Sequence, residues 1–222
     1  MVRALVPQQR GQRRGQPTFT SKVRRMARQI DKYRAIFDGA TFIRDGKTVT
    51  QKDYMAFDGG GIKRIVKALE KEIRSRKKAV TILDFGSGHG IHWHSQVLTK
   101  SDRKVSLVES IGPKLAGFYR YDPAHPLYDE KPTGKYDIIL CTDVLEHVPE
   151  ALVPSVLQEI RTYVKDDGII YLSIALEPSS NFFSDGENMH CTLMDTKRWE
   201  RFIAREMKGV KMSITYTGKR TW

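Results

Sequence analysis

The sequence predicts an α/β protein whose mainly parallel sheet is flanked by helices and preceded by a basic extension. Two observations carry this prediction: an apolar run enters a glycine-rich turn at residues 86–90, and a later apolar run ends in Thr142 and Asp143. Apolar runs of strand length alternate with amphipathic helical segments, which is the pattern of repeated strand–helix units. We therefore expect a basic N-terminal extension, residues 1–54, and a main domain, residues 55–222.

The extension is expected to contain an arm, an amphipathic helix and a hairpin. Residues 1–20 show no apolar periodicity, whereas the next segment repeats apolar side chains at three- and four-residue steps, which predicts a helix over about 21–37. Asp45-Gly46 lies between two short β-type runs and predicts a two-residue hairpin turn outside the main fold. The basic face of the helix suits nucleic acid or a membrane surface, but packing of its apolar stripe on the main domain is favoured. The stripe comprises Val23, Met26, Ile30, Tyr33 and Phe37.

The main domain begins with a helical stripe that follows the glycine triplet at 59–61 and precedes the first core strand. After the glycine turn a helix is expected. Two segments then compete as the following strand: residues 104–109, which alternate, and residues 117–121, which end at Asp122-Pro123. The later elements are a helix with a buried face from Val156 to Val164, a strand at 169–175, an irregular loop, a helix containing Trp199 and Met207, and a final strand at 210–216.

The positive charge of the chain is concentrated in its first third. Residues 1–80 hold 21 Lys and Arg against 7 acidic residues, a net charge of +14, whereas the remainder holds 17 against 19, a net charge of −2. An anionic partner for residues 1–80, such as nucleic acid or an acidic surface, is therefore one interpretation. A solvated basic arm and a cleaved organelle-targeting segment are the alternatives.

Length and composition set further limits. A chain of 222 residues suits one domain with a sizeable core and an extension. The longest apolar strand candidate, residues 169–176, is far shorter than the roughly twenty residues that span a bilayer, so no membrane insertion is expected. Cys141 and Cys191 are the two cysteines, which excludes a disulfide framework and a four-cysteine zinc site. A reducing, cytoplasmic location is the simplest expectation.

Two motifs together carry a family resemblance. ILDFGSGHG at 82–90 and DIILCTDVLEHVP at 137–149 resemble the class I S-adenosylmethionine-dependent methyltransferases, specifically a small subgroup with a DVLEH element after the fourth strand. The YDP element at 121–123 is similar to one in the same subgroup. The resemblance covers about residues 55–205. It implies a Rossmann-like fold, S-adenosylmethionine as the methyl donor and S-adenosylhomocysteine as the product. No metal is expected.

The glycine turn is the expected cofactor-binding element. Gly86, Gly88 and Gly90, with Ser87 between them, would let the backbone approach the cofactor, because a side chain would hold it away. Asp84 would buttress the turn or, as the resemblance implies, hydrogen-bond the methionine portion of the cofactor. A purely structural role for Asp84 as a turn-former is the alternative.

A carboxylate at the end of the second strand is expected to accept both ribose hydroxyls, since its two oxygens match a vicinal diol. Glu109 lies 25 residues beyond Asp84, near the spacing of the dinucleotide-binding pattern. Asp122 lies farther on but belongs to the YDP element, and it is preferred. Thr142 and Asp143 end the fourth strand and are expected to face the cofactor.

Asp143, His147 and His190 are the candidate catalytic residues. By resemblance Asp143 would face the methyl donor or the acceptor, and His190 belongs to a GxNxH element beside the acceptor site. His147 has a titration range that suits a general base. Packing or exposed histidines are the alternatives. The HGIHWH run at 89–94 is not interpreted as a metal site, because its third histidine would point away from the other two and no carboxylate or cysteine completes the set.

Absent motifs bear on the kind of methylation but do not identify the acceptor. The chain has no Asn-Pro-Pro-Tyr or Asp-Pro-Pro-Tyr element of base amino methylation and no Pro-Cys nucleophile. The expected reaction is therefore O- or N-methylation without a covalent enzyme intermediate, with a small-molecule acceptor. Two alternatives stay open: a methyltransferase directed to RNA or DNA by the basic N-terminal region, and a non-catalytic methyltransferase-like binding or structural protein.

Overall fold

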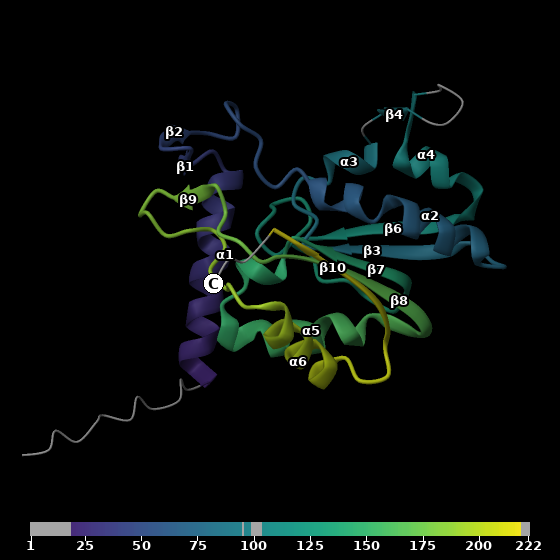
Figure 1. Ribbon diagram of the computed structural model, residues 1–222. Helices are drawn as coiled ribbons and strands as arrows, with labels where there is room; N and C mark the ends of the chain where they lie inside the picture. Colours follow the sequence, from purple (N-terminus) through teal and green to yellow (C-terminus); the bar gives the residue numbers. More distant parts are fainter. Residues whose placement is uncertain (1–18, 95, 99–103, 219–222) are drawn as a thin grey trace, which may run out of the picture.

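The computed structural model describes residues 19–94, 96–98 and 104–218, and its centre is a five-stranded sheet (Figure 1). All neighbouring strands in this sheet are parallel. The predicted parallel α/β architecture is therefore confirmed. In spatial order the strands are β10 (Lys211–Thr217), β8 (Val164–Ala175), β7 (Tyr136–Thr142), β3 (Val80–Phe85) and β6 (Leu115–Tyr121).

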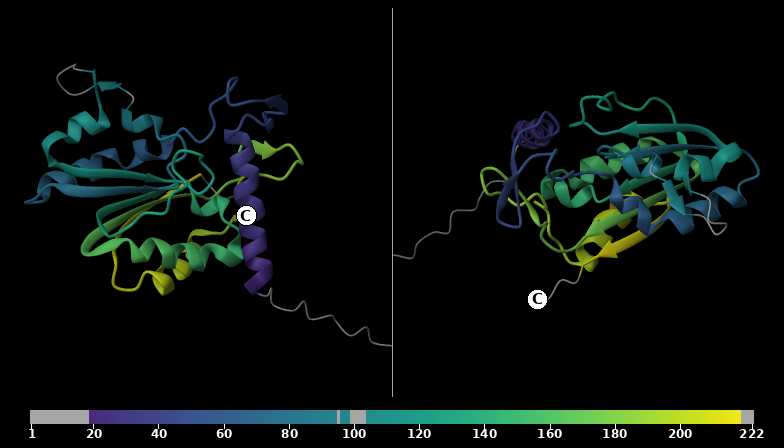
Figure 2. Two further views of the ribbon diagram at one scale, coloured as in Figure 1. Left: turned by 180° about the vertical axis from the view of Figure 1, so that it is seen from behind. Right: turned by 90° about the horizontal axis from the view of Figure 1, so that it is seen from above.

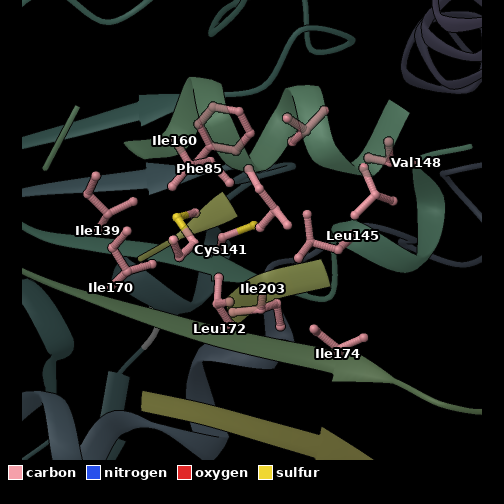
Figure 3. Packing of buried hydrophobic residues seen from close by; sticks show 14 of the residues in the cluster. Phe85, Ile139, Cys141, Leu145, Val148, Ile160, Ile170, Leu172, Ile174 and Ile203 are labelled. Atoms are coloured by element: carbon pink, nitrogen blue, oxygen red, sulfur yellow. The ribbon is translucent and has the colours of Figure 1, made fainter. Parts of the chain in front are cut away.

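Helices cover both faces of the sheet, which explains why the central parts of its inner strands carry apolar side chains on both faces. Ile138 and Leu140 of β7 pack on one face, while Ile139 and Cys141 pack on the other. Figure 3 shows the second face, where Cys141 lies among aliphatic side chains as a core residue. The first face is covered by α2 (Val66–Ser75), α3 (Ile91–His94) and α4 (Leu107–Ile111), and the second by α5 (Val153–Thr162) and α6 (Thr196–Glu206).

The N-terminal extension forms the long helix α1 (Phe19–Phe37) and the hairpin of β1 (Phe42–Arg44) and β2 (Lys47–Val49). The helix and the Asp45-Gly46 hairpin are thus confirmed. The expectation that the hairpin lies outside the main fold is wrong, because β1 also pairs with β9 (Asn181–Phe183) from the late irregular loop. Both views in Figure 2 show α1 beyond one end of the central sheet.

Of the two competing segments, residues 117–121 form the strand next to β3, as part of β6. The alternating segment is instead divided between a short strand, β5 (Lys104–Ser106), and helix α4. β5 pairs with β4 (Gln96–Leu98) in a small antiparallel ribbon. The helix that follows the glycine turn is only the four-residue α3.

Short 3-10 segments connect the larger elements, and one of them, η2, leads directly into the amino end of β6. None of the helices in the described part of the chain has both the length and the apolar composition needed to cross a bilayer. The 3-10 segments are η1 (Gly60–Arg64), η2 (Gly112–Lys114), η3 (Leu145–His147) and η4 (Glu150–Leu152).

Candidate active site

A cleft of about 920 Å³ lies beyond the carboxyl ends of β3, β6, β7 and β8. This is the edge at which open parallel α/β sheets bind their ligands. Four segments that follow these strands line the cleft, and helix α1 and the loop before η1 form the opposite wall. The volume lies within the range of about 300–1,000 Å³ of small-molecule sites.

The two motifs that the sequence analysis paired form adjacent walls of this cleft. β3 pairs directly with β7, so the glycine turn lies beside the loop that starts at Thr142. A Cβ atom on Gly86 would lie 2.4 Å from Val144 Cγ2, and one on Gly88 would lie 2.2 Å from the Phe57 carbonyl oxygen. Both glycines also have positive φ. Backbone conformation and close approach therefore both require glycine at these positions.

The cleft contains Asp122 but not Glu109. Asp122 follows β6, and its carboxylate accepts hydrogen bonds from the backbone N–H groups of Gly88 (3.0 Å) and Ala124 (2.9 Å). Burial raises the pKa of Asp122. Glu109 is exposed and caps α4 through a reciprocal capping box with Ser106. Glu109 as a ribose ligand is therefore contradicted by its position, because its carboxylate serves the helix N-terminus.

Asp84 lies behind the glycine turn and is not among the residues that line the cleft. Its buried carboxylate accepts a 2.6 Å hydrogen bond from the indole N–H of Trp93 in α3. Burial raises the pKa of Asp84 to about 6. This geometry fits the expected buttressing role, since the hydrogen bond ties β3 to the helix that follows the turn.

Asp84 makes the stability of the protein pH-dependent. Because its pKa is about 6 in the folded chain and 3.8 ordinarily, the folded state holds the proton more tightly than the unfolded state. Its contribution to the free energy of unfolding is fully present below about pH 4 and falls by about 3 kcal/mol as the pH rises through 6. Asp84→Asn keeps an acceptor oxygen for Trp93 but lacks the titration.

Urea unfolding between about pH 4 and 7 measures this effect. Relative to Asp84→Asn, the wild-type protein should lose about 3 kcal/mol of its free energy of unfolding as the pH rises over that range. Asp166→Asn, which changes an exposed carboxylate, is the control and should follow the wild type. A difference between the wild type and Asp84→Asn that does not vary with pH would contradict the assignment.

Asp143 is held at the end of β7 in a strained conformation. Its φ is +56°, and its carboxylate pairs with Arg64 Nη1 at 2.5 Å and accepts a 3.0 Å hydrogen bond from Ser173 Oγ. Arg64 ends η1, which lies close because Gly61 has no side chain; a Cβ there would be 2.8 Å from Asp143 Oδ2. Asp143 and Thr142 both line the cleft.

His147 and His190 meet at the same end of the cleft, although 43 positions separate them. Their rings are perpendicular, with centroids 4.8 Å apart. His147 Nδ1 lies 2.7 Å from the Tyr33 hydroxyl and 3.0 Å from the Met189 carbonyl oxygen, and His190 Nδ1 lies 2.6 Å from the Glu177 carbonyl oxygen. Burial lowers the pKa of His147 to about 3 and also lowers that of His190.

Glu146 completes this end of the cleft with a fully buried carboxyl group. Its Oε1 accepts a 2.8 Å hydrogen bond from the Ala175 N–H, while its Oε2 has no hydrogen-bond partner among the described residues. Burial raises the pKa of Glu146 to about 8. An unpartnered buried oxygen that lines a cleft is available to a ligand.

Helix α1 closes the cleft from the outside. Tyr33 makes an edge contact with Phe57, Phe37 packs against Phe57 at a tilt, and Phe37 also contacts His89 and His125. Ion pairs hold the helix in place on both sides of the cleft. Lys32 binds Asp185 and Glu187 of the late loop, and Arg34 binds Asp129 and the Pro123 carbonyl oxygen. Met26 and Tyr33 of the apolar stripe thus pack on the protein's own core, as favoured from the sequence, whereas the side chain of Val23 lies outside the described part.

The histidines of the HGIHWH run are dispersed. His92 pairs with Asp58 at 2.9 Å, His89 Nδ1 lies 3.2 Å from His125 Nε2, and His94 is exposed. They support the loop before η1 and the wall around Phe37. Among the described residues they form no group with the geometry of metal ligands.

Residues 54–209 match a family model described as a methyltransferase domain, which is more than half of the chain. The chain belongs to this family. With its parallel sheet and glycine turn it is a class I S-adenosylmethionine-dependent methyltransferase.

Curated relatives of the methyltransferase are named ubiquinone biosynthesis O-methyltransferase. The protein from Acinetobacter baylyi is 30% identical over 115 residues, which are 46% of this chain and 47% of that protein. The protein from Bordetella pertussis is 28% identical over 114 residues, which are 46% of this chain and 46% of that protein. The protein from Pseudomonas paraeruginosa is 28% identical over 115 residues, which are 47% of this chain and 48% of that protein. The chain thus spans about half the length of the curated relatives it matches. No solved structure matches the chain significantly.

The cleft of the methyltransferase fits the donor that its family uses. The glycine turn presents backbone without side chains, and Asp122 presents a half-buried carboxylate one strand away. Sequence reasoning missed Tyr33 as a partner of His147, Phe57 as the residue against Gly88, and Arg64 as the partner of Asp143. The sequence offered a signal for one of them: Tyr33 belongs to the apolar stripe of α1.

Proposed function

We propose that this methyltransferase transfers the methyl group of S-adenosylmethionine to a hydroxyl oxygen of a small organic acceptor. The observation that carries the proposal is the shared cleft, in which the glycine turn and the group of Asp143, His147 and His190 face one volume. The names of the curated relatives support oxygen as the accepting atom.

Methyl transfer is an in-line displacement, so the main task of the protein is to align donor and acceptor and to exclude water. When bound, S-adenosylmethionine supplies the electrophilic methyl group. In our proposal the backbone at Gly86 and Gly88 approaches the donor, and the Asp122 carboxylate accepts hydrogen bonds from the ribose hydroxyls. Asp143 and Thr142 bound the donor on the side of β7.

The acceptor lies between the donor and helix α1 in this proposal. Tyr33, Phe37 and Phe57 give that side of the cleft an aromatic lining, which favours a flat or apolar acceptor over a polyanion. The hydroxyl group to be methylated lies against Asp143, His147 and His190. Because an unactivated hydroxyl is a weak nucleophile, these residues must help to remove its proton.

Transfer of labelled methyl groups from S-adenosylmethionine tests the proposed function. The purified protein is incubated with phenol, catechol, aniline, total RNA and a fractionated small-molecule extract. We expect label in hydroxylated small molecules and none in RNA. Label confined to RNA, or to amines, would overturn the acceptor assignment, and absence of both transfer and cofactor binding would overturn the enzymatic role.

Two carboxylate variants control the cofactor part of this experiment. Asp122→Asn should weaken S-adenosylhomocysteine binding by about 10- to 100-fold, because the charged acceptor for the ribose diol is lost. Glu109→Gln, at the competing position, should leave the affinity unchanged. Isothermal titration measures both, and equal affinities in the two variants would contradict the ribose assignment.

A further inference from the structure

We propose that Glu146, His147 and His190 form a binding site for a divalent transition-metal ion at the acceptor end of the cleft. One potential ligand atom from each residue lies within 4.8 Å of the other two. Ligands that share one ion at about 2.0–2.2 Å lie about 3–4 Å apart, so small side-chain rotations complete the set. All three residues line the cleft.

The hydrogen bonds of the two histidines leave a lone pair on the same ring atom in each. The Met189 and Glu177 carbonyl oxygens can only accept, so His147 Nδ1 and His190 Nδ1 each carry the proton. Both Nε2 atoms are then unprotonated. A backbone carbonyl that fixes the Nδ1 proton and orients the ring is the usual support of a metal-bound histidine. Tyr33 adds a second contact at His147 Nδ1.

Glu146 supplies the third ligand through its carboxyl group, which releases its proton when the ion binds. Its Oε1 is held by the Ala175 N–H, and this bond orients Oε2, the buried oxygen without a hydrogen-bond partner among the described residues. The adjacent cation does not fill this role, because Arg64 pairs with Asp143 and Ser173. Two histidines with an unprotonated ring nitrogen and a carboxyl oxygen without a hydrogen-bond partner among the described residues thus belong to one group, which a bound cation would satisfy.

The ligand set indicates the class of ion and its use. Two imidazoles and one carboxylate suit Zn²⁺, Co²⁺, Fe²⁺ or Mn²⁺ rather than Ca²⁺. Three protein ligands would leave coordination positions open, where an acceptor hydroxyl could bind and release its proton to solvent more readily. This last step rests on the proposed function. A metal site at this position makes His147 and His190 ligands of the ion instead of free bases.

Cobalt binding to the full-length, untagged, chelator-treated protein tests the site. We expect about one Co²⁺ per chain after dialysis, measured by elemental mass spectrometry, together with visible absorption bands of a protein-bound ion. Glu146→Gln keeps an oxygen for the Ala175 N–H but removes the charge, and His190→Ala removes one imidazole. Each should weaken Co²⁺ binding by about 100-fold or more.

His94→Ala is the matched control, because His94 is exposed and lies outside the site, and it should bind Co²⁺ as the wild type does. Equal binding in all variants, or no binding in the wild type, would overturn the site. Isothermal titration with S-adenosylhomocysteine runs in parallel: unchanged affinity in Glu146→Gln shows that the fold and the donor site are intact. Metal binding without methyl transfer to any hydroxyl would refute the proposed function while supporting the site.

Discussion

Replacing Gly88 with alanine is expected to abolish cofactor binding, with an affinity loss of about 100-fold or more. The new Cβ would lie 2.2 Å from the Phe57 carbonyl oxygen, a backbone atom that cannot rotate away. Phe57 would have to move, although its carbonyl oxygen accepts a 2.8 Å hydrogen bond from the His89 N–H. The glycine turn and the loop that contains Phe57 would therefore be displaced together. We also expect the free energy of unfolding to fall by about 2–5 kcal/mol, from the positive φ of +52° and the overpacking.

Gly134→Ala separates the two causes. Gly134 also has a positive φ, +86°, but a Cβ there would meet no atom of the described residues within 4 Å. This control should lose about 1–2 kcal/mol of stability and keep its affinity for S-adenosylhomocysteine. Isothermal titration and urea unfolding measure both quantities. If Gly88→Ala bound the cofactor as well as Gly134→Ala did, the glycine turn would not be the donor site.

Local patterns predicted most of the fold because each depends on neighbouring residues. The apolar run into the glycine turn gave β3, and the Asp45-Gly46 pair gave the hairpin of β1 and β2. The segment 104–109 was ambiguous because it alternates like a strand, yet Ser106 and Glu109 form a capping box that begins α4. That Ser-x-x-Glu spacing is a helix-start signal within the sequence, and it would have favoured Asp122 over Glu109 at once.

The contacts that build the site depend on residues far apart in the chain. Arg64 reaches Asp143 across 79 positions, and Tyr33 reaches His147 across 114. No local periodicity indicates such pairs. From the sequence, His147 and His190 are two separate candidate bases. The HGIHWH run is the segment weighed, and rejected, as a metal-binding site. The group with Glu146 forms only because β7, β8 and the late loop bring the three residues together.

Deleting residues 1–40 is expected to lower kcat/KM for a small hydroxylated acceptor by about 100-fold or more, with a smaller effect on cofactor affinity. The deletion removes α1, and with it the aromatic wall and the Tyr33 hydroxyl beside His147. The donor side is less affected because its glycine turn belongs to β3. Tyr33→Ala in the full chain removes the same contacts at one position, and it tests the wall even if the shortened chain fails to fold.

Deletion of residues 1–18 alone is the decisive comparison, because it removes Arg3, Arg10, Arg13 and Arg14 but leaves α1. If α1 acts as a wall of the acceptor site, this shorter deletion keeps full activity on a small acceptor. If the basic arm instead delivers a nucleic acid, the same deletion abolishes transfer, and wild-type binding to RNA falls steeply with added salt, because phosphate contacts release counterions. Lys32 and Arg34 already pair with acidic residues of the chain, so they are engaged within the fold. These two charges of α1 thus hold the helix over the cleft, and a helix that forms a wall of the acceptor site predicts that the shorter deletion keeps full activity.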